Sequence, residues 1–299
     1  MSMPNFIVLG AGKAGTQSVY NYLMEHPEIY MSPTKETNFF ALNGRQPDFK
    51  GPPDPINQYS VASIETYQAL FDRVTDEKAI GEVSPLYLYS AEAPANIKQA
   101  IPNAKLIVIL RNPVDRAFST YLFLRARLTE TITDFSDALN REETRIEQNW
   151  PWPWHYKNLG FYHKQLQRYY DLFDPAQIKI YLYEDFRADN IAIVQDMYEF
   201  LGVDANFVPD VSLQYNFSGL PKNKLLQYVL TGPNPIQSAL RPLMPTKLRR
   251  KIVSRIKRKN LTKPSLAPEV RRQLVDYYRE EMIQLQQLLD RDLSHWMQS

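Results

Sequence analysis

The sequence predicts an α/β fold of three layers, in which a central parallel sheet lies between helices and the C-terminal part is helical. Three observations predict it. Short apolar runs alternate with helical patterns, a glycine-rich loop joins the first run to the first helix, and 44% of the 299 residues are hydrophobic. A chain of this length can bury one large core, so we expect a single domain over residues 1–299.

Five short apolar runs are the expected strands, and each is followed by a helical pattern or by a loop that leads to one. They span residues 5–9, 28–31, 79–83, 105–110 and 177–183. Such alternation favours parallel strands with helices on both faces of the sheet. Residues 43–60 contain four prolines and two glycines and are expected to form a long surface loop. Beyond Gly202 we expect mainly helix.

Composition excludes several classes of protein. The chain has no cysteine, and its four histidines lack the spacing of a zinc site, so we expect no disulfide, no thiol nucleophile and no metal. No run approaches the roughly 20 apolar residues of a membrane span, and residues 1–10 lack the apolar region of a signal peptide. We therefore expect a cytoplasmic protein.

A basic segment stands out from a chain whose net charge is only +2. Residues 241–263 contain ten lysines or arginines and no acidic residue, and Leu248, Ile252 and Ile256 recur in them at helical spacing. Two interpretations stay open. The segment either contacts an anionic membrane or a polyanion, or forms a solvated helix whose apolar stripe packs on the domain.

The glycine-rich loop GAGKAG, residues 10–15, predicts a phosphate site, because it leads from a strand into a helix N-terminus. It matches a dinucleotide motif, but Glu36 does not end an apolar strand as the ribose-binding acid of that motif would. A Walker A loop would have lysine where Thr16 stands, and here Lys13 lies inside the loop. The strand at 105–110 leads into Arg111 rather than a magnesium-binding Asp. The pattern favours a P-loop-like site in which protein cations, not a metal, neutralise phosphate.

The stretch RNPVDRAFSTY, residues 111–121, predicts a second phosphate contact. Asn112 is a suitable N-cap and Pro113 suits the first helical turn, so Arg111 should stand at the carboxyl end of a strand. Open α/β sheets bind ligands at that edge. Ser119 should lie two turns into the helix, where it could clamp a phosphate together with Arg111.

Together the two stretches resemble the 5′-phosphosulfate loop and the 3′-phosphate motif of sulfotransferases that use 3′-phosphoadenosine 5′-phosphosulfate (PAPS). Other segments agree with this family in order: KETNFF (35–40), GEVSPLYL (81–88), YEDF (183–186), FSGLPKNKLL (217–226) and the closing LLDRDLSHW. The resemblance spans nearly the whole chain and is nearest to a bacterial member related to the carbohydrate, heparan-type enzymes. It implies a transferase with a P-loop-like fold.

The resemblance also implies roles for individual residues. Lys13 would contact the leaving 5′-phosphate, and Glu36 would be the base that takes the acceptor's proton. The implied cofactor-binding residues are Gly12, Lys13, Gly15, Thr16, Gln17 and Ser18 at the 5′-phosphate, Arg111 and Ser119 at the 3′-phosphate, and Lys222 and Lys224 closing over the nucleotide. The implied cofactor is PAPS, with 3′,5′-ADP as product and no metal.

The acceptor is less well defined by the sequence. The family implies an alcohol or an amine, with carbohydrates and lipids as candidates and no nucleic acid partner. Heparan-type enzymes commonly carry a lysine where Val83 stands, which argues against a glycosaminoglycan, while Glu82 and Ser84 remain candidates to line the site. The stretch NWPWPWHY, residues 149–156, offers Trp152, Trp154 and His155 either for substrate contact or for packing of a loop on the core.

Two other functions stay open from the residues alone. One is a P-loop nucleotide kinase, and the other is a non-catalytic module that binds a nucleotide or a polyanion. Dependence on magnesium would identify the kinase, and turnover of PAPS would exclude the binding module.

Overall fold

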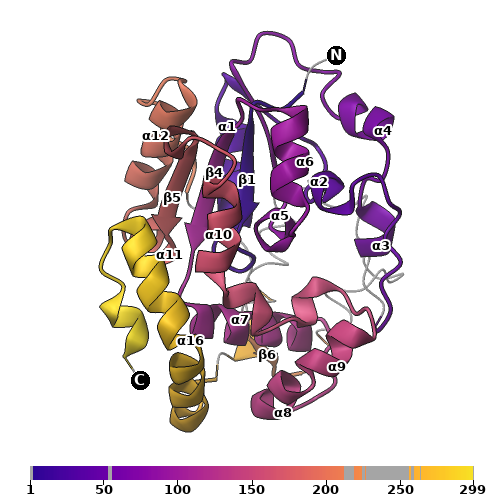
Figure 1. The fold of residues 1–299 in the computed structure, drawn as a ribbon, viewed down its shortest axis with the longest axis vertical. Coiled ribbons are helices and arrows are strands. Elements are labelled where there is room, and N and C mark those ends of the chain that lie inside the picture. Colours follow the sequence, from indigo (N-terminus) through magenta and orange to yellow (C-terminus); the bar gives the residue numbers. More distant parts are fainter. Residues whose placement is uncertain are drawn as a thin grey trace.

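The computed structural model describes residues 3–52, 56–211, 219–223, 226, 256, 259–262 and 264–298. In these ranges five strands form one parallel sheet in the order β2-β3-β1-β4-β5 (Figure 1). The strands are β1 (Phe6–Gly10), β2 (Ile29–Met31), β3 (Ala79–Val83), β4 (Lys105–Leu110) and β5 (Ile178–Leu182). The prediction of an α/β fold with five parallel strands is confirmed, with each strand end within one residue of its expected position.

Helices cover the sheet on both faces, which explains why every residue of β1 is buried. In Figure 1, α6 and α10 cross in front of the strands, while α1 packs with α12 and against β2. The helical elements are α1 (Thr16–Glu25), α2 (Phe39–Leu42), α3 (Ile56–Tyr59), α4 (Ile64–Ala69), α5 (Leu86–Tyr89), α6 (Ala93–Ala100), α7 (Pro113–Ala126), α8 (Phe135–Asn140), α9 (Glu142–Glu147), η1 (Trp152–Trp154), η2 (Asn158–Gly160), α10 (Tyr162–Tyr170), η3 (Pro175–Gln177), α11 (Tyr183–Ala188), α12 (Asn190–Leu201), α16 (Pro268–Leu289) and η4 (Ser294–Met297).

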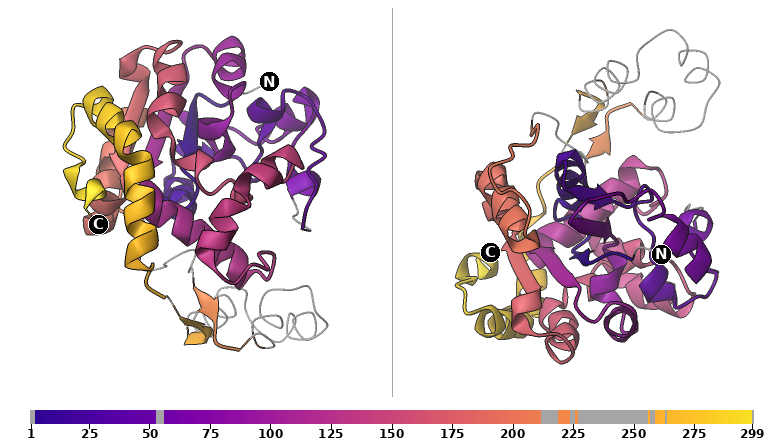
Figure 2. Two further views of the ribbon diagram at one scale, coloured as in Figure 1. Left: turned by 60° about the horizontal axis from the view of Figure 1, so that its bottom comes forward. Right: turned by 90° about the horizontal axis from the view of Figure 1, so that it is seen from above.

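Two expectations about the chain outside the sheet need correction. Residues 43–60 are not only a surface loop, because α3 forms within them and Ile56 is buried in a small hydrophobic cluster with Trp152. The chain after Gly202 is helical in α16, but residues 203–211 are irregular. The short antiparallel pair of β6 (Leu220–Pro221) and β7 (Leu261–Thr262) was also not predicted, and Figure 2 shows it away from the central sheet.

Most of the basic segment 241–263 lies outside the described residues, as do Leu248 and Ile252 of its apolar stripe and Lys224. The expected contact with a membrane or a polyanion therefore stays a prediction. Among the helices that the structure describes, none is long and apolar enough to cross a membrane.

The two predicted phosphate-binding stretches lie side by side because they follow neighbouring strands at the centre of the sheet. Residues 11–15 come after β1 and Arg111 comes after β4, and these two strands pair in parallel. Asn112 caps α7 as predicted, since its Oδ1 accepts the backbone N–H of Val114 at 2.9 Å. Pro113 is the first residue of that helix, so Arg111 itself stands outside it.

Candidate functional site

The glycine loop turns sharply between β1 and α1. Gly15 is the N-cap of α1 with φ of 98°, a left-handed conformation that favours glycine. A Cβ added there would lie 3.2 Å from the ring of Phe186, so the loop is also closely packed. The turn leaves the first backbone N–H groups of α1 directed toward a ligand position, as at other helix N-termini that bind anions.

Lys13 is a partly buried cation in a basic environment. The pKa of its ammonium is lowered from 10.5 to about 7, mainly by burial and in addition by the nearby charges of Arg111, Lys35 and Arg127. Its Nζ lies 4.1 Å from the centre of the Phe123 ring. Because neighbouring cations disfavour its charged form, a bound anion would stabilise the ammonium.

Glu36 lies in the same cavity as the glycine loop. The cavity has a volume of about 350 Å³, and its lining includes Gly12, Lys13, Thr16, Gln17, Lys35 and Glu36. The Lys35 ammonium is 3.3 Å from Oε1 of Glu36, whose side chain is 24% exposed. Glu36 is the one acidic residue in this lining, so the structure brings the predicted base and the predicted phosphate loop together.

Arg111 bridges the loop and a second cavity. Its Nη1 donates to the carbonyl oxygen of Lys13 at 3.0 Å, and its guanidinium lies 4.8 Å from the centre of the Tyr183 ring. The second cavity is lined by Arg111 together with polar residues of α11 and the C-terminal η4. Ser119 is buried on α7 and lines neither of these two cavities.

The remaining predicted nucleotide residues lie at the edge of the site. Ser18 is in the first turn of α1, and its N–H donates to the carbonyl of Gly15 at 2.9 Å. Lys222 is exposed beside β6, and its N–H donates to the carbonyl of Asn260 at 2.7 Å. β6 packs against α7, the helix that carries Ser119.

Glu82 and Ser84 do not line the cavity, contrary to the expectation from sequence. Both are fully buried, and Glu82 accepts hydrogen bonds from four hydroxyl groups: Thr37 at 2.5 Å, Tyr67 at 2.6 Å, and Ser84 and Tyr87 at 2.8 Å. Burial raises the pKa of the Glu82 carboxyl, and these hydrogen bonds oppose the rise. Since Thr37 follows Glu36 directly, this network supports the segment that carries Glu36.

The aromatic stretch divides between the cavity and the core. Trp152 lines the cavity, whereas Trp154 is completely buried in the main core. His155 is buried behind the cavity wall, where its Nδ1 lies 3.1 Å from the hydroxyl of Tyr89. Burial lowers the pKa of His155 to about 4, so the imidazole is neutral at pH 7.

Several lining residues come from one face of α7 and its C-cap and were not predicted. Arg116, Thr120, Phe123 and Arg127 all line the cavity. Their spacing of four, three and four residues places them on one helix face. That spacing is visible in the sequence, but it also fits an ordinary buried face, so it does not indicate a site by itself.

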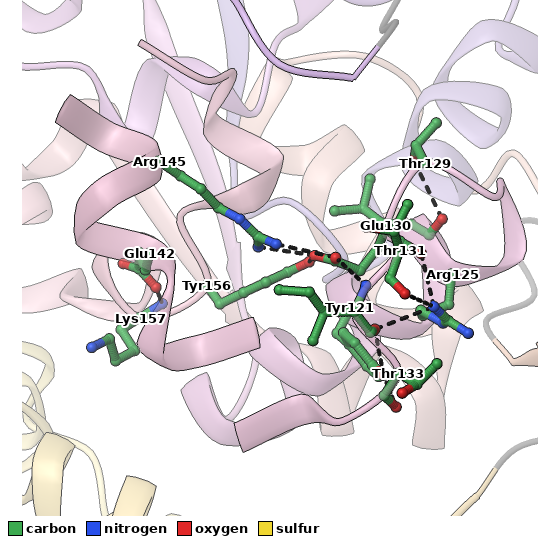
Figure 3. A network of polar contacts seen from close by, with 12 residues as sticks. Tyr121, Arg125, Thr129, Glu130, Thr131, Thr133, Glu142, Arg145, Tyr156 and Lys157 are labelled. Atoms are coloured by element: carbon green, nitrogen blue, oxygen red, sulfur yellow. Dashed lines mark hydrogen bonds and ion pairs between the residues drawn. The ribbon is translucent and has the colours of Figure 1, made fainter. Parts of the chain in front are cut away.

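A buried polar network holds the segment that carries Trp152 (Figure 3). Glu130 and Arg145 form an ion pair at 2.9 Å, with side chains 1% and 5% exposed. The hydroxyl of Tyr156 donates to the same carboxylate at 2.6 Å. The carboxylate of Glu142 accepts the N–H groups of Lys157 and, at 2.8 Å, Asn158.

Removing one partner of this ion pair should destabilise the fold strongly. Arg145→Leu leaves the Glu130 carboxylate buried without its cation, and we expect a loss of about 3–5 kcal/mol in the free energy of unfolding. Urea denaturation measures it. The control is Arg279→Leu, which removes an exposed ion pair with Asp276 and should cost less than about 1 kcal/mol. Equal losses in the two variants would contradict the prediction.

A glycine loop follows a central parallel strand, and several cations lie beside one carboxylate in the adjoining cavity. These features define an α/β protein whose site suits a phosphorylated ligand. Among the described residues no group of three or more His, Cys, Asp or Glu could hold a metal ion. The chain belongs to the sulfotransferase domain family, whose model matches residues 4–286. The predicted family is thereby confirmed.

Known proteins resemble the chain over different lengths. The crystal structure of a sulfotransferase from Alicyclobacillus acidocaldarius is 33% identical, with a TM-score of 0.80 over 100% of both chains. The membrane-associated sulfotransferase kil1 of Dictyostelium discoideum is 34% identical over 126 residues, which are 41% of this chain and 23% of kil1. The mouse bifunctional heparan sulfate N-deacetylase/N-sulfotransferase 4 is 26% identical over 97% of this chain. The match covers 30% of that mouse protein, so this chain corresponds to a part of both curated relatives.

Proposed function

We propose that this chain transfers the sulfuryl group of PAPS to a hydroxyl or an amine of an acceptor and releases 3′,5′-ADP. One observation carries the proposal: Lys13, Lys35 and Glu36 share one cavity with the glycine loop. The cations there can balance the charge of a phosphate, and Glu36 supplies a carboxylate that can accept a proton. Bound PAPS would supply an activated sulfuryl group on a phosphate leaving group.

The residues of the loop suit the 5′-phosphate end of the donor. Lys13 would neutralise the charge that develops on the leaving oxygen. The N–H groups of Gly12, Gly15, Thr16 and Gln17, together with the hydroxyl of Ser18, would surround the phosphate. Glu36 would orient the acceptor and take its proton as the new bond forms. The ammonium of Lys35, 3.3 Å from Oε1 of Glu36, would help to orient that carboxylate.

The 3′-phosphate would lie at the next strand. Arg111 contacts the glycine loop through the Lys13 carbonyl, so one arginine can couple the two phosphate positions. Ser119 on α7 and the exposed Lys222 would complete that contact, with Lys224 as a further candidate outside the described residues. A kinase of the P-loop type would carry a magnesium-binding acid after β4, where Arg111 stands. This substitution favours the sulfotransferase over the kinase.

Nucleotide binding without magnesium tests the proposal. We expect 3′,5′-ADP to bind with nearly the same affinity in excess EDTA as in magnesium, and to bind more tightly than ATP, which lacks the 3′-phosphate. Isothermal titration calorimetry measures both. Equal affinities for the two nucleotides would contradict the two-phosphate arrangement, and turnover of PAPS to 3′,5′-ADP excludes a module that only binds.

Arg111→Ala should weaken this binding selectively. Loss of a charge-assisted contact of roughly 1.5–3 kcal/mol lowers the affinity for 3′,5′-ADP by about 10- to 150-fold. The affinity for 5′-AMP should change much less, because that nucleotide has no 3′-phosphate. The exposed Arg272→Ala serves as the control for the loss of one positive charge. If Arg111→Ala loses affinity equally for both nucleotides, Arg111 does not contact the 3′-phosphate.

A further inference from the structure

The cavity that contains Lys13 and Glu36 has an apolar wall as well as a basic one. Its main apolar lining residues come from α3, α5, η1 and η2: Ile56, Leu88, Trp152, Pro153 and Leu159. Ile56 and Trp152 belong to a hydrophobic cluster separate from the main core. A cavity of about 350 Å³ has the size of a small-molecule site, and its apolar wall favours a guest with an apolar body.

The wall is fixed from behind by buried contacts, so it exists without a guest. The carboxylate of Glu142 accepts the backbone N–H of Asn158 at 2.8 Å. The hydroxyl of Tyr156 donates to Glu130 at 2.6 Å. These contacts anchor residues 152–159 at both their middle and their end (Figure 3). A guest therefore binds without first ordering this segment, which lowers the entropic cost of binding.

One polar group in this wall has a defined hydrogen-bonding direction. Nε2 of His155 lies 3.1 Å from the carbonyl oxygen of Trp150, which can only accept, so Nε2 must carry a proton. Since His155 is neutral at pH 7, its Nδ1 has a lone pair. The hydroxyl of Tyr89, 3.1 Å from Nδ1, must then be the donor.

Tyr89 lines the cavity, and its proton is already used. Burial raises the pKa of this phenol to about 12, so the hydroxyl stays protonated at pH 7. The oxygen can accept a further hydrogen bond but cannot donate one. An O–H or N–H group on a guest matches it, whereas a sulfate, carboxylate or ether oxygen does not.

We propose, on the basis of the proposed function, that the acceptor is a compact apolar alcohol or phenol with two hydroxyl groups. One hydroxyl reacts, and the second donates a hydrogen bond to the hydroxyl oxygen of Tyr89. The reacting hydroxyl gives its proton to Glu36 while its oxygen bonds to sulfur and the bond from sulfur to the phosphate oxygen breaks. The second hydroxyl is not consumed. His155 is a positioning residue, because it acts only through Tyr89.

A polyanionic glycan could pair with Arg116 and Arg127 of the basic wall, but it fits the apolar wall less well. Sulfate and carboxylate groups that face Trp152 and Leu159 would lose water there without a donor from Tyr89 in exchange.

Naphthalene diols test the inference on the complex with 3′,5′-ADP, so that binding is measured without turnover. Calorimetry compares each dihydroxynaphthalene isomer with its monomethyl ether and with a hydroxynaphthoate, and PAPS turnover is measured in parallel. We expect the best diol to bind about three- to tenfold more tightly than its ether, the effect of one neutral hydrogen bond. The ether keeps the reacting hydroxyl and the apolar body. The difference in affinity between diol and ether therefore measures the contribution of the second hydroxyl.

Four variants test which side chains cause the preference for the diol over the ether. Tyr89→Phe should abolish the preference for diol over ether, and the exposed Tyr277→Phe should keep it. In His155→Leu the hydroxyl of Tyr89 no longer donates to the imidazole and can donate to a guest. The affinity for the ether should therefore rise relative to the affinity for the diol. Trp152→Ala should weaken every naphthol by at least about tenfold. Unchanged 3′,5′-ADP affinity shows that each variant is folded.

The inference is overturned if the wild type binds ethers as well as diols, or if heparosan binds more tightly than every diol. These outcomes differ from failure of the proposed function, which would show as absent binding of 3′,5′-ADP itself.

Discussion

We expect Lys13→Ala to bind 3′,5′-ADP about 10- to 150-fold more weakly than the wild type and to transfer sulfuryl groups about 10²- to 10³-fold more slowly. The lysine contacts the phosphate before the reaction and also neutralises charge that builds up on the leaving oxygen, so both quantities should fall. Calorimetry and single-turnover kinetics measure them. Lys164→Ala, an exposed lysine on α10, is the matched control and should change neither.

The pH dependence of binding follows from the same residue. In the empty site the Lys13 pKa is about 7, and a bound phosphate favours the charged form and raises this pKa. Above pH 7 the lysine must therefore take up a proton on binding, so affinity for 3′,5′-ADP should fall as pH rises from 7 to about 9, by up to about tenfold per unit. Arginine keeps its charge throughout this range, so Lys13→Arg should bind with little dependence on pH. If the affinity of Lys13→Arg for 3′,5′-ADP still falls with rising pH, the pH dependence comes from another group.

Glu36→Gln should separate binding from chemistry. Glutamine keeps the size and reach of the side chain but cannot accept the proton, so we expect 3′,5′-ADP affinity within about threefold of wild type. Sulfuryl transfer should slow by at least about a hundredfold, the usual effect of losing a general base. The measurement is turnover at saturating PAPS with a surrogate phenol or alcohol.

Glu147→Gln is the control for Glu36→Gln, since Glu147 is exposed at the end of α9. Its turnover should equal that of the wild type. If Glu36→Gln keeps more than about a tenth of wild-type turnover, Glu36 is not the base. His155 would not replace it directly, because it lies behind Tyr89 and does not line the cavity.

The places of the glycine loop and of Arg111 at the ends of their strands can be predicted from the sequence because the signals are local. Gly15, Asn112 and Pro113 act through the backbone of their own turns, so spacing alone places Lys13 and Arg111 at the ends of strands. The pairing of β1 with β4 then follows from the rules for parallel sheets.

The acceptor side could not be predicted in the same way because long-range packing decides it. Glu82 was expected near the substrate, but hydroxyl groups of Thr37, Tyr67 and Tyr87 surround it from three separate segments. Tyr89 belongs to the cavity only because residues 152–159 fold against it. No local spacing records which side chains of different segments will meet.

The apolar wall has a consequence for how new specificities arise. Ile56, Leu88, Trp152 and Leu159 lie on short helical turns outside the sheet, whereas Lys13 and Arg111 follow its two central strands. Substitutions in those turns can therefore accumulate while the donor platform stays intact. A combinatorial library at these four positions of the wall would sample acceptors of different shape on one scaffold, and divergence within such a lineage would concentrate there.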